Sequence, residues 1–188
     1  MRKIILWMQM SLDGFIEGPN GDMGWLSPDE DEMWKDTFDE LTSVDTFLLG
    51  RGMYPEYARY WTSALTKASK NEANFARIAE KTQHIVFSRT LSKVDPVGRG
   101  KTRIIEDAEE IRRLKNGPGK NMVIWGGASM ASTFINLGLV DEYRLTVVPV
   151  VLGGGKALFN NLKQKHTLKL LETRPLKSGA VMLRYQSV

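Results

Sequence analysis

The chain has 188 residues, with 26 Lys and Arg against 22 Asp and Glu, a formal net charge of +4 and no cysteine. This length favours one domain with a single sizeable core. The lack of cysteine excludes a disulfide framework, a cysteine-ligated metal site and a cysteine nucleophile, and the two histidines argue against a histidine-rich metal site or a Ser–His–Asp hydrolase.

The hydrophobic pattern predicts alternating strands and helices and then a strand-rich end. Strands are expected at residues 3–10, 45–49, 84–88, 102–105, 121–125, 142–151, 167–174 and 179–187. Helices are expected from the capping box Ser27-Pro28-Asp29-Glu30 onward, and over 71–81, 108–115 and 128–137. We therefore expect a single α/β domain over residues 1–188, with a mixed, mostly parallel sheet, flanking helices and antiparallel C-terminal strands.

The basic residues are spread along the chain and alternate with acids, as in residues 106–115 (EDAEEIRRLK). No nucleic-acid partner is therefore expected. The apolar run at residues 4–10 (IILWMQM) is too short to span a bilayer, and no cleavage site follows it. Together with the lack of cysteine, this predicts a cytoplasmic protein that does not bind a membrane.

Residues 121–130 (NMVIWGGASM) carry the strongest signal for a bound ligand. An apolar strand ends in Gly126-Gly127 and leads directly into a helix. Glycine lets the phosphates of a ligand approach the backbone, and the helix N-terminus offers free N–H groups and a partial positive charge. The alternative is a tight strand–helix turn without a ligand. Neither G-x-G-x-x-G nor a P-loop is present.

Two further strand ends have the same character. LLGR ends in Gly50-Arg51, and VFSRT ends in Ser88-Arg89-Thr90. Ligands of open α/β sheets bind beyond the carboxyl ends of the parallel strands, so these ends are expected at one edge. Arginines beside hydroxyls suit a long phosphorylated ligand, whereas each arginine taken singly indicates a solvated surface charge.

Two glycine-rich loops are expected near this edge. Residues 10–25 (MSLDGFIEGPNGDMGW) hold four glycines with the apolar Phe15 and Ile16. Such a loop can close over a bound ring and exclude water, and an ordinary surface hairpin is the alternative. Residues 152–155 (LGGG) favour a turn first and close approach to a cofactor second.

In this order, SLDGFI…GDMGW, LLGR, VFSRT, VIWGGASM and GLVDEYRLTVVPVVLGGGKALF resemble the dihydrofolate reductase-like superfamily. Within it, the chain resembles the branch of the riboflavin-biosynthesis reductase domain and its stand-alone relatives, over essentially its whole length. The resemblance implies an NADPH-dependent reductase acting on a pyrimidine- or pteridine-like ring, with 5-amino-6-(5-phosphoribosylamino)uracil reductase-like activity. It also implies a homodimer.

The resemblance assigns cofactor contacts to matching positions only. For the nicotinamide side these are Met8, Gln9, Gly14, Ile16 and Trp25. For the 2′-phosphate they are Arg51, after Gly50, and the turn Ser88-Arg89-Thr90; for the pyrophosphate they are Gly126, Gly127, Ala128, Ser129 and Met130. Because arginines beside hydroxyls are suited to a 2′-phosphate, NADPH is favoured over NADH.

The catalytic acid of the dihydrofolate reductases matches Glu30, and the threonine that pairs with that acid matches Thr146. Each match has an alternative. Glu30 can instead be the capping-box partner of Ser27, and Thr146 can be an ordinary buried threonine.

The chain also departs from the family pattern. It has no cysteine for the zinc site of a deaminase, so deamination is excluded, and after Trp25 it lacks the basic pattern that would face a substrate phosphate. Residues 53–61 (MYPEYARYW) are aromatic and suit a substrate pocket, core packing or a dimer interface, the last through Tyr54, Tyr57, Tyr60 and Trp61. A non-catalytic nucleotide-binding protein with the same fold is the alternative function.

Overall fold

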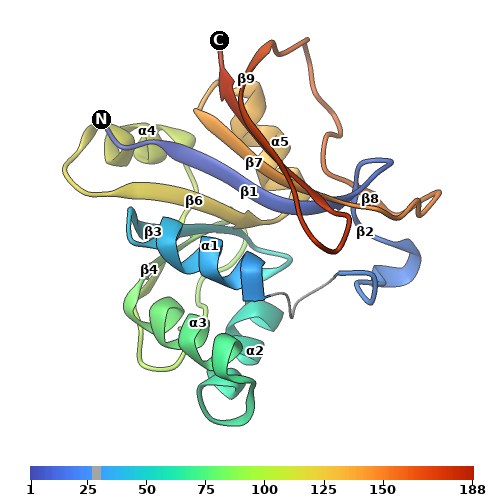
Figure 1. Cartoon of the computed structure of the whole chain (residues 1–188). Helices are drawn as coiled ribbons and strands as arrows, with labels where there is room; N and C mark the ends of the chain where they lie inside the picture. Colours follow the sequence, from blue (N-terminus) through green and yellow to red (C-terminus); the bar gives the residue numbers. More distant parts are fainter. Residues whose placement is uncertain (27–30) are drawn as a thin grey trace.

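A computed structural model describes residues 1–26 and 31–188. Its elements, in chain order, are β1 (Ile4–Ser11), β2 (Phe15–Glu17), a 3-10 turn (Pro19–Gly21), α1 (Asp31–Leu41), β3 (Val44–Gly50), α2 (Tyr54–Lys67), α3 (Lys70–Lys81), β4 (Gln83–Phe87), β5 (Thr102–Ile105), α4 (Ala108–Asn116), β6 (Asn121–Gly126), α5 (Ala128–Asn136), β7 (Glu142–Val148), β8 (Lys156–Ala157), β9 (Leu168–Pro175) and β10 (Val181–Ser187). Figure 1 shows their arrangement.

Eight of the strands form one sheet in the order β5-β4-β3-β6-β1-β7-β10-β9. The first six in this order run parallel, and β10 is antiparallel to both β7 and β9. Strand β1 lies between β6 and β7, where Ile4, Ile5 and Leu6 are fully buried. A central parallel strand needs apolar side chains on both faces, which explains the unbroken apolar run. The expected mixed, mostly parallel sheet with antiparallel C-terminal strands is confirmed.

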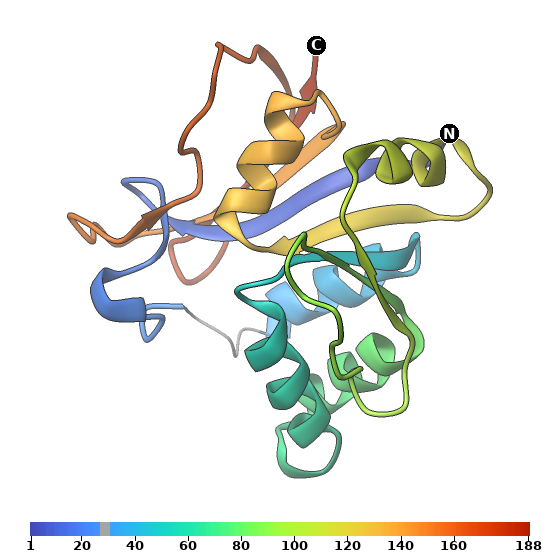
Figure 2. The same cartoon turned by 180° about the vertical axis from the view of Figure 1, so that it is seen from behind.

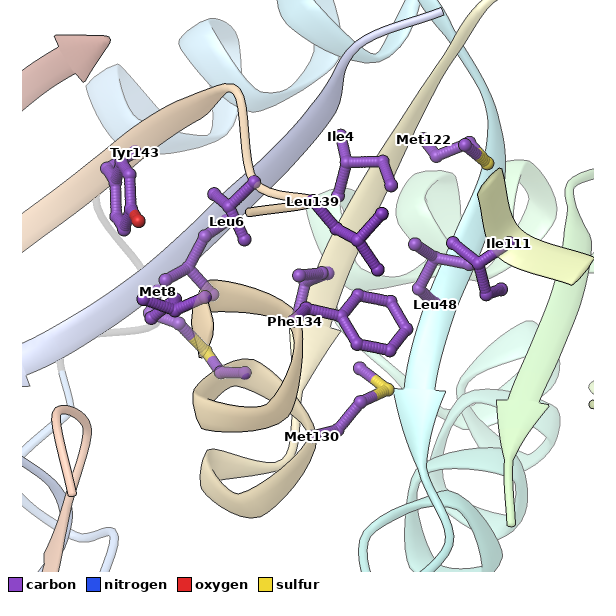
Figure 3. Packing of buried hydrophobic residues seen from close by; sticks show 14 of the residues in the cluster. Ile4, Leu6, Met8, Leu48, Ile111, Met122, Met130, Phe134, Leu139 and Tyr143 are labelled. Atoms are coloured by element: carbon purple, nitrogen blue, oxygen red, sulfur yellow. The ribbon is translucent and has the colours of Figure 1, made fainter. Parts of the chain in front are cut away.

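Helices cover both faces of the sheet (Figures 1 and 2). On one face, Ile111 of α4 and Met130 and Phe134 of α5 pack against Leu6 and Leu48 of the strands (Figure 3). On the other face, helices α1, α2 and α3 pack over an aromatic cluster that includes Phe47, Tyr57, Phe75 and Trp125. Because helices cover both faces of the sheet, the loops at the ends of the strands are the segments left to form binding sites.

Helix α2 corrects one sequence interpretation, because no helix was predicted over residues 53–61. Pro55 lies in the first turn, where its missing N–H has no helical partner to lose. Tyr54 and Tyr57 are 0% and 5% exposed, so the core-packing alternative is confirmed for both, and neither is available to a subunit interface. The homodimer remains a prediction without support from these two tyrosines.

Histidine 84 on β4 is a buried titratable group in the aromatic core. It is 0% exposed, its Nε2 lies 3.2 Å from the Tyr57 hydroxyl oxygen, and its ring meets Phe47 edge-on. Burial disfavours the imidazolium ion and lowers the pKa of His84 from 6.5 to about 4.

We therefore expect the free energy of unfolding to fall as the pH is lowered from 6.5 towards 4. In this window the unfolded chain binds a proton at His84 and the folded chain does not, which amounts to about 3 kcal/mol over the full window. Urea denaturation at several pH values, on the protein and on His84→Gln, measures the effect. The comparison is made between pH 6.5 and about 5, because most carboxylates titrate below this range. If the free energy of unfolding fell equally steeply there in both proteins, the prediction would be contradicted.

Candidate functional site

The carboxyl ends of β3 and β6 touch through their backbones. A Cβ built on Gly127 would lie 3.1 Å from the Cα of Gly50, and one on Gly50 would lie 3.4 Å from the Cα of Gly127. Gly127 also has φ +101°, a conformation that other residues rarely adopt. A Cβ on Gly126 would overlap the sulfur of Met53. Glycine at position 127 therefore lets these two strand ends approach each other closely.

Helix α5 starts directly after this contact. Gly127 is its N-cap residue and supplies no side-chain cap, so the first-turn N–H groups receive no hydrogen bond from a capping side chain. Ala128 and Met130 are buried in the core, whereas Ser129 is exposed. The N-terminus of α5 is thus held rigidly with a positive partial charge at the edge of the sheet, an arrangement that suits a phosphate.

The ends of β3 and β4 are joined by side chains. Nη1 of Arg51 donates a hydrogen bond to Oγ1 of Thr90 at 3.2 Å, and both residues are exposed. The buried Ser88 hydroxyl accepts the N–H groups of Thr90 and Leu91 at 3.1 and 3.0 Å, which fixes the turn that carries the exposed Arg89. The structure therefore brings Arg51 and the Ser88–Thr90 turn together, as the sequence predicted for one sheet edge.

The two glycine-rich loops pair with each other. Strands β2 and β8 form a small antiparallel sheet, and the Asp13 carboxylate accepts the N–H groups of Leu152 and Gly153 at 3.1 and 2.8 Å. A hydrogen bond from the Ser11 hydroxyl lowers the pKa of Asp13. The 152–155 loop is thus held against the 10–25 loop. Asp13 positions the 152–155 loop, and the sequence interpretation missed this residue. Its only sequence signal is a carboxylate between glycine-rich turns.

The residues predicted for the nicotinamide side lie on both faces of β1 and along the following loop. Met8 packs into the core beneath α5, whereas Gln9 lies in register with Thr146, on the face covered by α1. Gly14 has φ +87° and Ile16 lies on β2. The indole N–H of Trp25 donates to the Asp22 carbonyl at 3.1 Å. These residues border one edge of the sheet without forming a single cluster of side chains.

A cavity of about 250 Å³ lies between α1 and the strands β7, β9 and β10. Thr146, which is 4% exposed, lines it together with Trp7 and the guanidinium groups of Arg144, Arg174 and Arg184. Glu30, the predicted acid, lies outside the described residues, as does the Ser27 capping box. The structure therefore places Thr146 beside a cavity and says nothing of its predicted partner.

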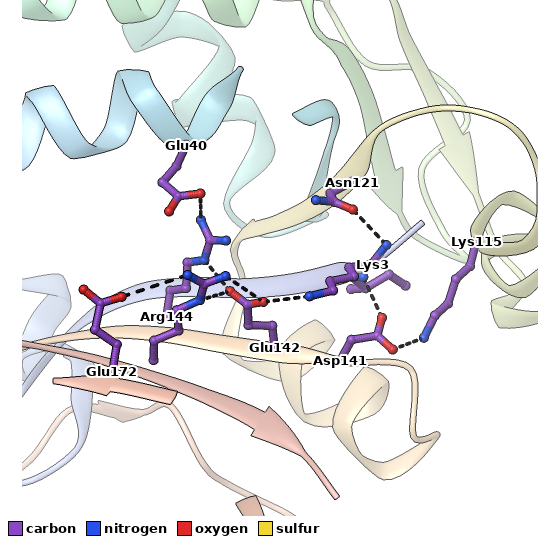
Figure 4. Close-up of polar contacts among 10 residues, drawn as sticks. Lys3, Glu40, Lys115, Asn121, Asp141, Glu142, Arg144 and Glu172 are labelled. Carbon is purple, nitrogen blue, oxygen red and sulfur yellow. Dashed lines mark hydrogen bonds and ion pairs between the residues drawn. The ribbon is translucent and has the colours of Figure 1, made fainter. Parts of the chain in front are cut away.

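Two of the arginines that line this cavity form ion pairs with the buried Glu142 (Figure 4). Glu142, 1% exposed, accepts hydrogen bonds from Nε of Arg144 and from Nε of Arg184, both at 2.7 Å. Burial alone would raise the pKa of Glu142, but these hydrogen bonds outweigh it and hold the pKa below its usual range. Arg144 also lies over the Trp7 ring, 5.6 Å from its centroid.

Sequence reasoning missed these cavity residues. Their signal is the alternation Glu142, Arg144, Thr146 within an otherwise apolar strand, which places three polar side chains on one face. In the part of the chain that the structure describes, no helix is long and apolar enough to cross a membrane.

Residues 2–182 match the family model of the RibD C-terminal domain. The chain is 40% identical over 186 residues to the uncharacterized protein YyaP of Bacillus subtilis (strain 168), covering 98% of this chain and 94% of that protein. It is 33% identical over 187 residues to the uncharacterized protein YwjB of the same strain, covering 98% and 97%.

Solved structures show the same fold at low sequence identity. A Shewanella sp. PV-4 protein assigned to riboflavin biosynthesis superposes with a TM-score of 0.78 at 20% identity, over 99% of both chains. A pyrimidine reductase-like protein from Corynebacterium diphtheriae has a TM-score of 0.63 at 15% identity, over 100% of this chain and 92% of that one. Dihydrofolate reductase from Enterococcus faecalis, solved with NADP(H), has a TM-score of 0.63 at 14% identity, over 98% and 96%. The dihydrofolate reductase-like fold is thereby confirmed.

The glycine contact predicts the effect of Gly127→Ala. We expect a loss of about 1–3 kcal/mol from the strained backbone alone, and a further loss because the new Cβ would press on Gly50. Gly14→Ala is the control with a similar φ, since Gly14 has φ +87° and no atom lies within 4 Å of its built Cβ. Urea denaturation of both variants compares them. Equal losses would show that the contact with Gly50 contributes nothing.

Proposed function

This chain belongs to the RibD C-terminal domain family, and we propose that it is an NADPH-dependent reductase of a pyrimidine- or pteridine-like ring. The observation that carries the proposal is the joint edge of β3, β4 and β6, where a glycine–glycine backbone contact, a helix N-terminus and an Arg51–Thr90 pair lie together. That combination is suited to a ligand with several phosphates.

The residues of this edge fit the parts of a dinucleotide. Gly126, Gly127 and the first turn of α5 would hold the pyrophosphate, because no capping side chain occupies the N–H groups at the start of the helix. Arg51, Arg89 and the Ser88–Thr90 turn would bind the 2′-phosphate that distinguishes NADPH from NADH. The bound cofactor supplies the hydride.

The face of β1 that α1 covers would receive the substrate. Gln9 Oε1 is buried and has no hydrogen-bond partner among residues 1–26 and 31–188, and a ring N–H would satisfy it. Gln9 and Thr146 would orient the ring, and the paired loops 10–25 and 152–155 would exclude water from hydride transfer. A proton would reach the reduced ring from Glu30 or from water.

Binding of NADPH should raise the melting temperature. A ligand at about 100 times its dissociation constant adds roughly 2.7 kcal/mol to the free energy of unfolding. At about 2–4 °C per kcal/mol for a domain of this size, the melting temperature should rise by about 5–11 °C. No shift with NADPH, beside a clear shift with another nucleotide, would contradict the proposal. NADPH binding without NADPH oxidation, across pterins, pyrimidines and quinones, would instead favour the non-catalytic nucleotide-binding alternative.

Loss of the edge arginines should weaken NADPH more than NADH. Arg51→Ala and Arg89→Ala should each raise the dissociation constant of NADPH at least about tenfold, because a hydrogen bond to a charged group is worth about 1.5–3 kcal/mol. Isothermal calorimetry with both cofactors measures the difference. Arg113→Ala, which removes an exposed arginine on α4, is the control and should leave both affinities unchanged. Equal effects on NADPH and NADH would refute the 2′-phosphate assignment.

A further inference from the structure

The cavity beside Thr146 carries more carboxylates than cations. Four acidic residues line it against three basic ones: Asp36, Asp39, Glu40 and Glu172, against Arg144, Arg174 and Arg184. Glu142, which lies beneath two of these arginines, and Glu32, which pairs with the third, add two more negative charges, and Lys3, which also pairs with Glu142, adds one positive charge. A ligand that enters the cavity therefore meets a surplus of negative charge.

Each of the three arginines already has carboxylate partners. Arg174 donates to Glu32 at 2.8 Å and to Asp36. The other two, Arg144 and Arg184, share the buried Glu142.

The outer ends of these two guanidinium groups also face carboxylates, although neither Nη1 atom makes a hydrogen bond within the described part of the chain. Nη1 of Arg144 lies 2.5 Å from Glu40, and Nη1 of Arg184 lies 4.0 Å from Glu172. A phosphate that bound these groups would lie close to carboxylates that remain in the same cavity.

The wall formed by α1 adds no cation that could change this balance. The helix carries five acidic residues and one lysine, Lys35, whose ammonium group pairs with Asp39 at 2.6 Å. Like charges brought together in a partly desolvated site disfavour binding strongly. The exposed Arg51 and Arg89 lie instead at the carboxyl ends of β3 and β4, on the side that we assign to the cofactor.

We infer that the substrate of this reductase is a heterocycle without a phosphate group. The inference rests on the proposed function and separates this chain from the phosphoribosyl substrate that its family resemblance implies. The cavity selects against an anionic tail. Gln9 Oε1, in register with the cavity residue Thr146, is a buried acceptor without a partner among the described residues, and a ring N–H that reached it would satisfy it. Recognition would thus come from neutral hydrogen bonding rather than from phosphate binding.

Matched ligand pairs test this inference on the full chain saturated with NADPH. The probes are 5-amino-6-ribosylaminouracil and its 5′-phosphate, and neopterin and its monophosphate, with binding followed by calorimetry. In at least one pair, the member without phosphate should bind about tenfold or more tightly than its partner. Tighter or equal binding of the phosphorylated members would overturn the inference, and so would the absence of binding by every unphosphorylated probe.

NADPH binding is measured first in the same samples, and this separates the two levels of the account. Failure to bind NADPH removes the proposed function. Normal NADPH binding with a preference for phosphorylated probes removes only the inference about the substrate.

Charge variants give a second, independent readout. Glu32→Gln with Asp36→Asn removes both partners of Arg174 and should shift the binding ratio at least about tenfold towards the phosphorylated probes. Glu109→Gln with Glu110→Gln is the matched control, because it removes two arginine-paired carboxylates from α4 on the opposite face. If the double variant fails to fold, Asp36→Asn alone should shift the ratio in the same direction. An unchanged ratio in a folded variant that binds NADPH would contradict the inference.

Discussion

The backbone contact between Gly50 and Gly127 sets the geometry of the whole carboxyl edge. It joins the ends of β3 and β6 so closely that a Cβ on Gly127 would press on Gly50, and α5 begins at that point. On the other side of β3, the parallel pairing with β4 places the Ser88–Thr90 turn within reach of Arg51. The N-terminus of α5 and the Arg51–Thr90 pair thus share one edge of the sheet, because the ends of β3 and β6 pack together through glycines.

Charge divides the proposed site into two halves. The edge assigned to the cofactor presents exposed arginines beside hydroxyl groups, whereas the cavity between α1 and β7–β10 holds its arginines in ion pairs under an acidic helix. The formal charge of +4 therefore says little about the substrate. The phosphates of a dinucleotide and an uncharged ring would be sorted by these two environments to separate parts of one site, with the nicotinamide and the ring meeting between them.

The sequence predicts those parts of the fold that depend on local patterns. The unbroken apolar run of β1 indicates a central strand, and Gly126-Gly127 before a helix indicates a turn at the carboxyl edge. Helix α2 escaped prediction because its aromatic face suits a pocket, a core or an interface equally well, and only burial of Tyr54 and Tyr57 decides among them.

The cavity arginines escaped prediction for a different reason. Arg174 on β9 meets Glu32 and Asp36 on α1 across 138 or more positions of sequence, and no local pattern encodes such a pairing. The same holds for Asp13, which reaches the N–H groups of residues 152 and 153 only after β2 and β8 have paired. The cofactor edge is therefore visible in the sequence, whereas the character of the substrate cavity emerges only from the fold.

Amide hydrogen exchange with and without saturating NADPH tests the central claim most directly, because it reports on every strand end at once. The account predicts slower exchange in three separate segments together: residues 50–52, 88–91 and 126–130, with little change in α4. Protection confined to one of these segments, or protection of α4 with none at the carboxyl edge, would contradict a single dinucleotide site built on the Gly50–Gly127 contact.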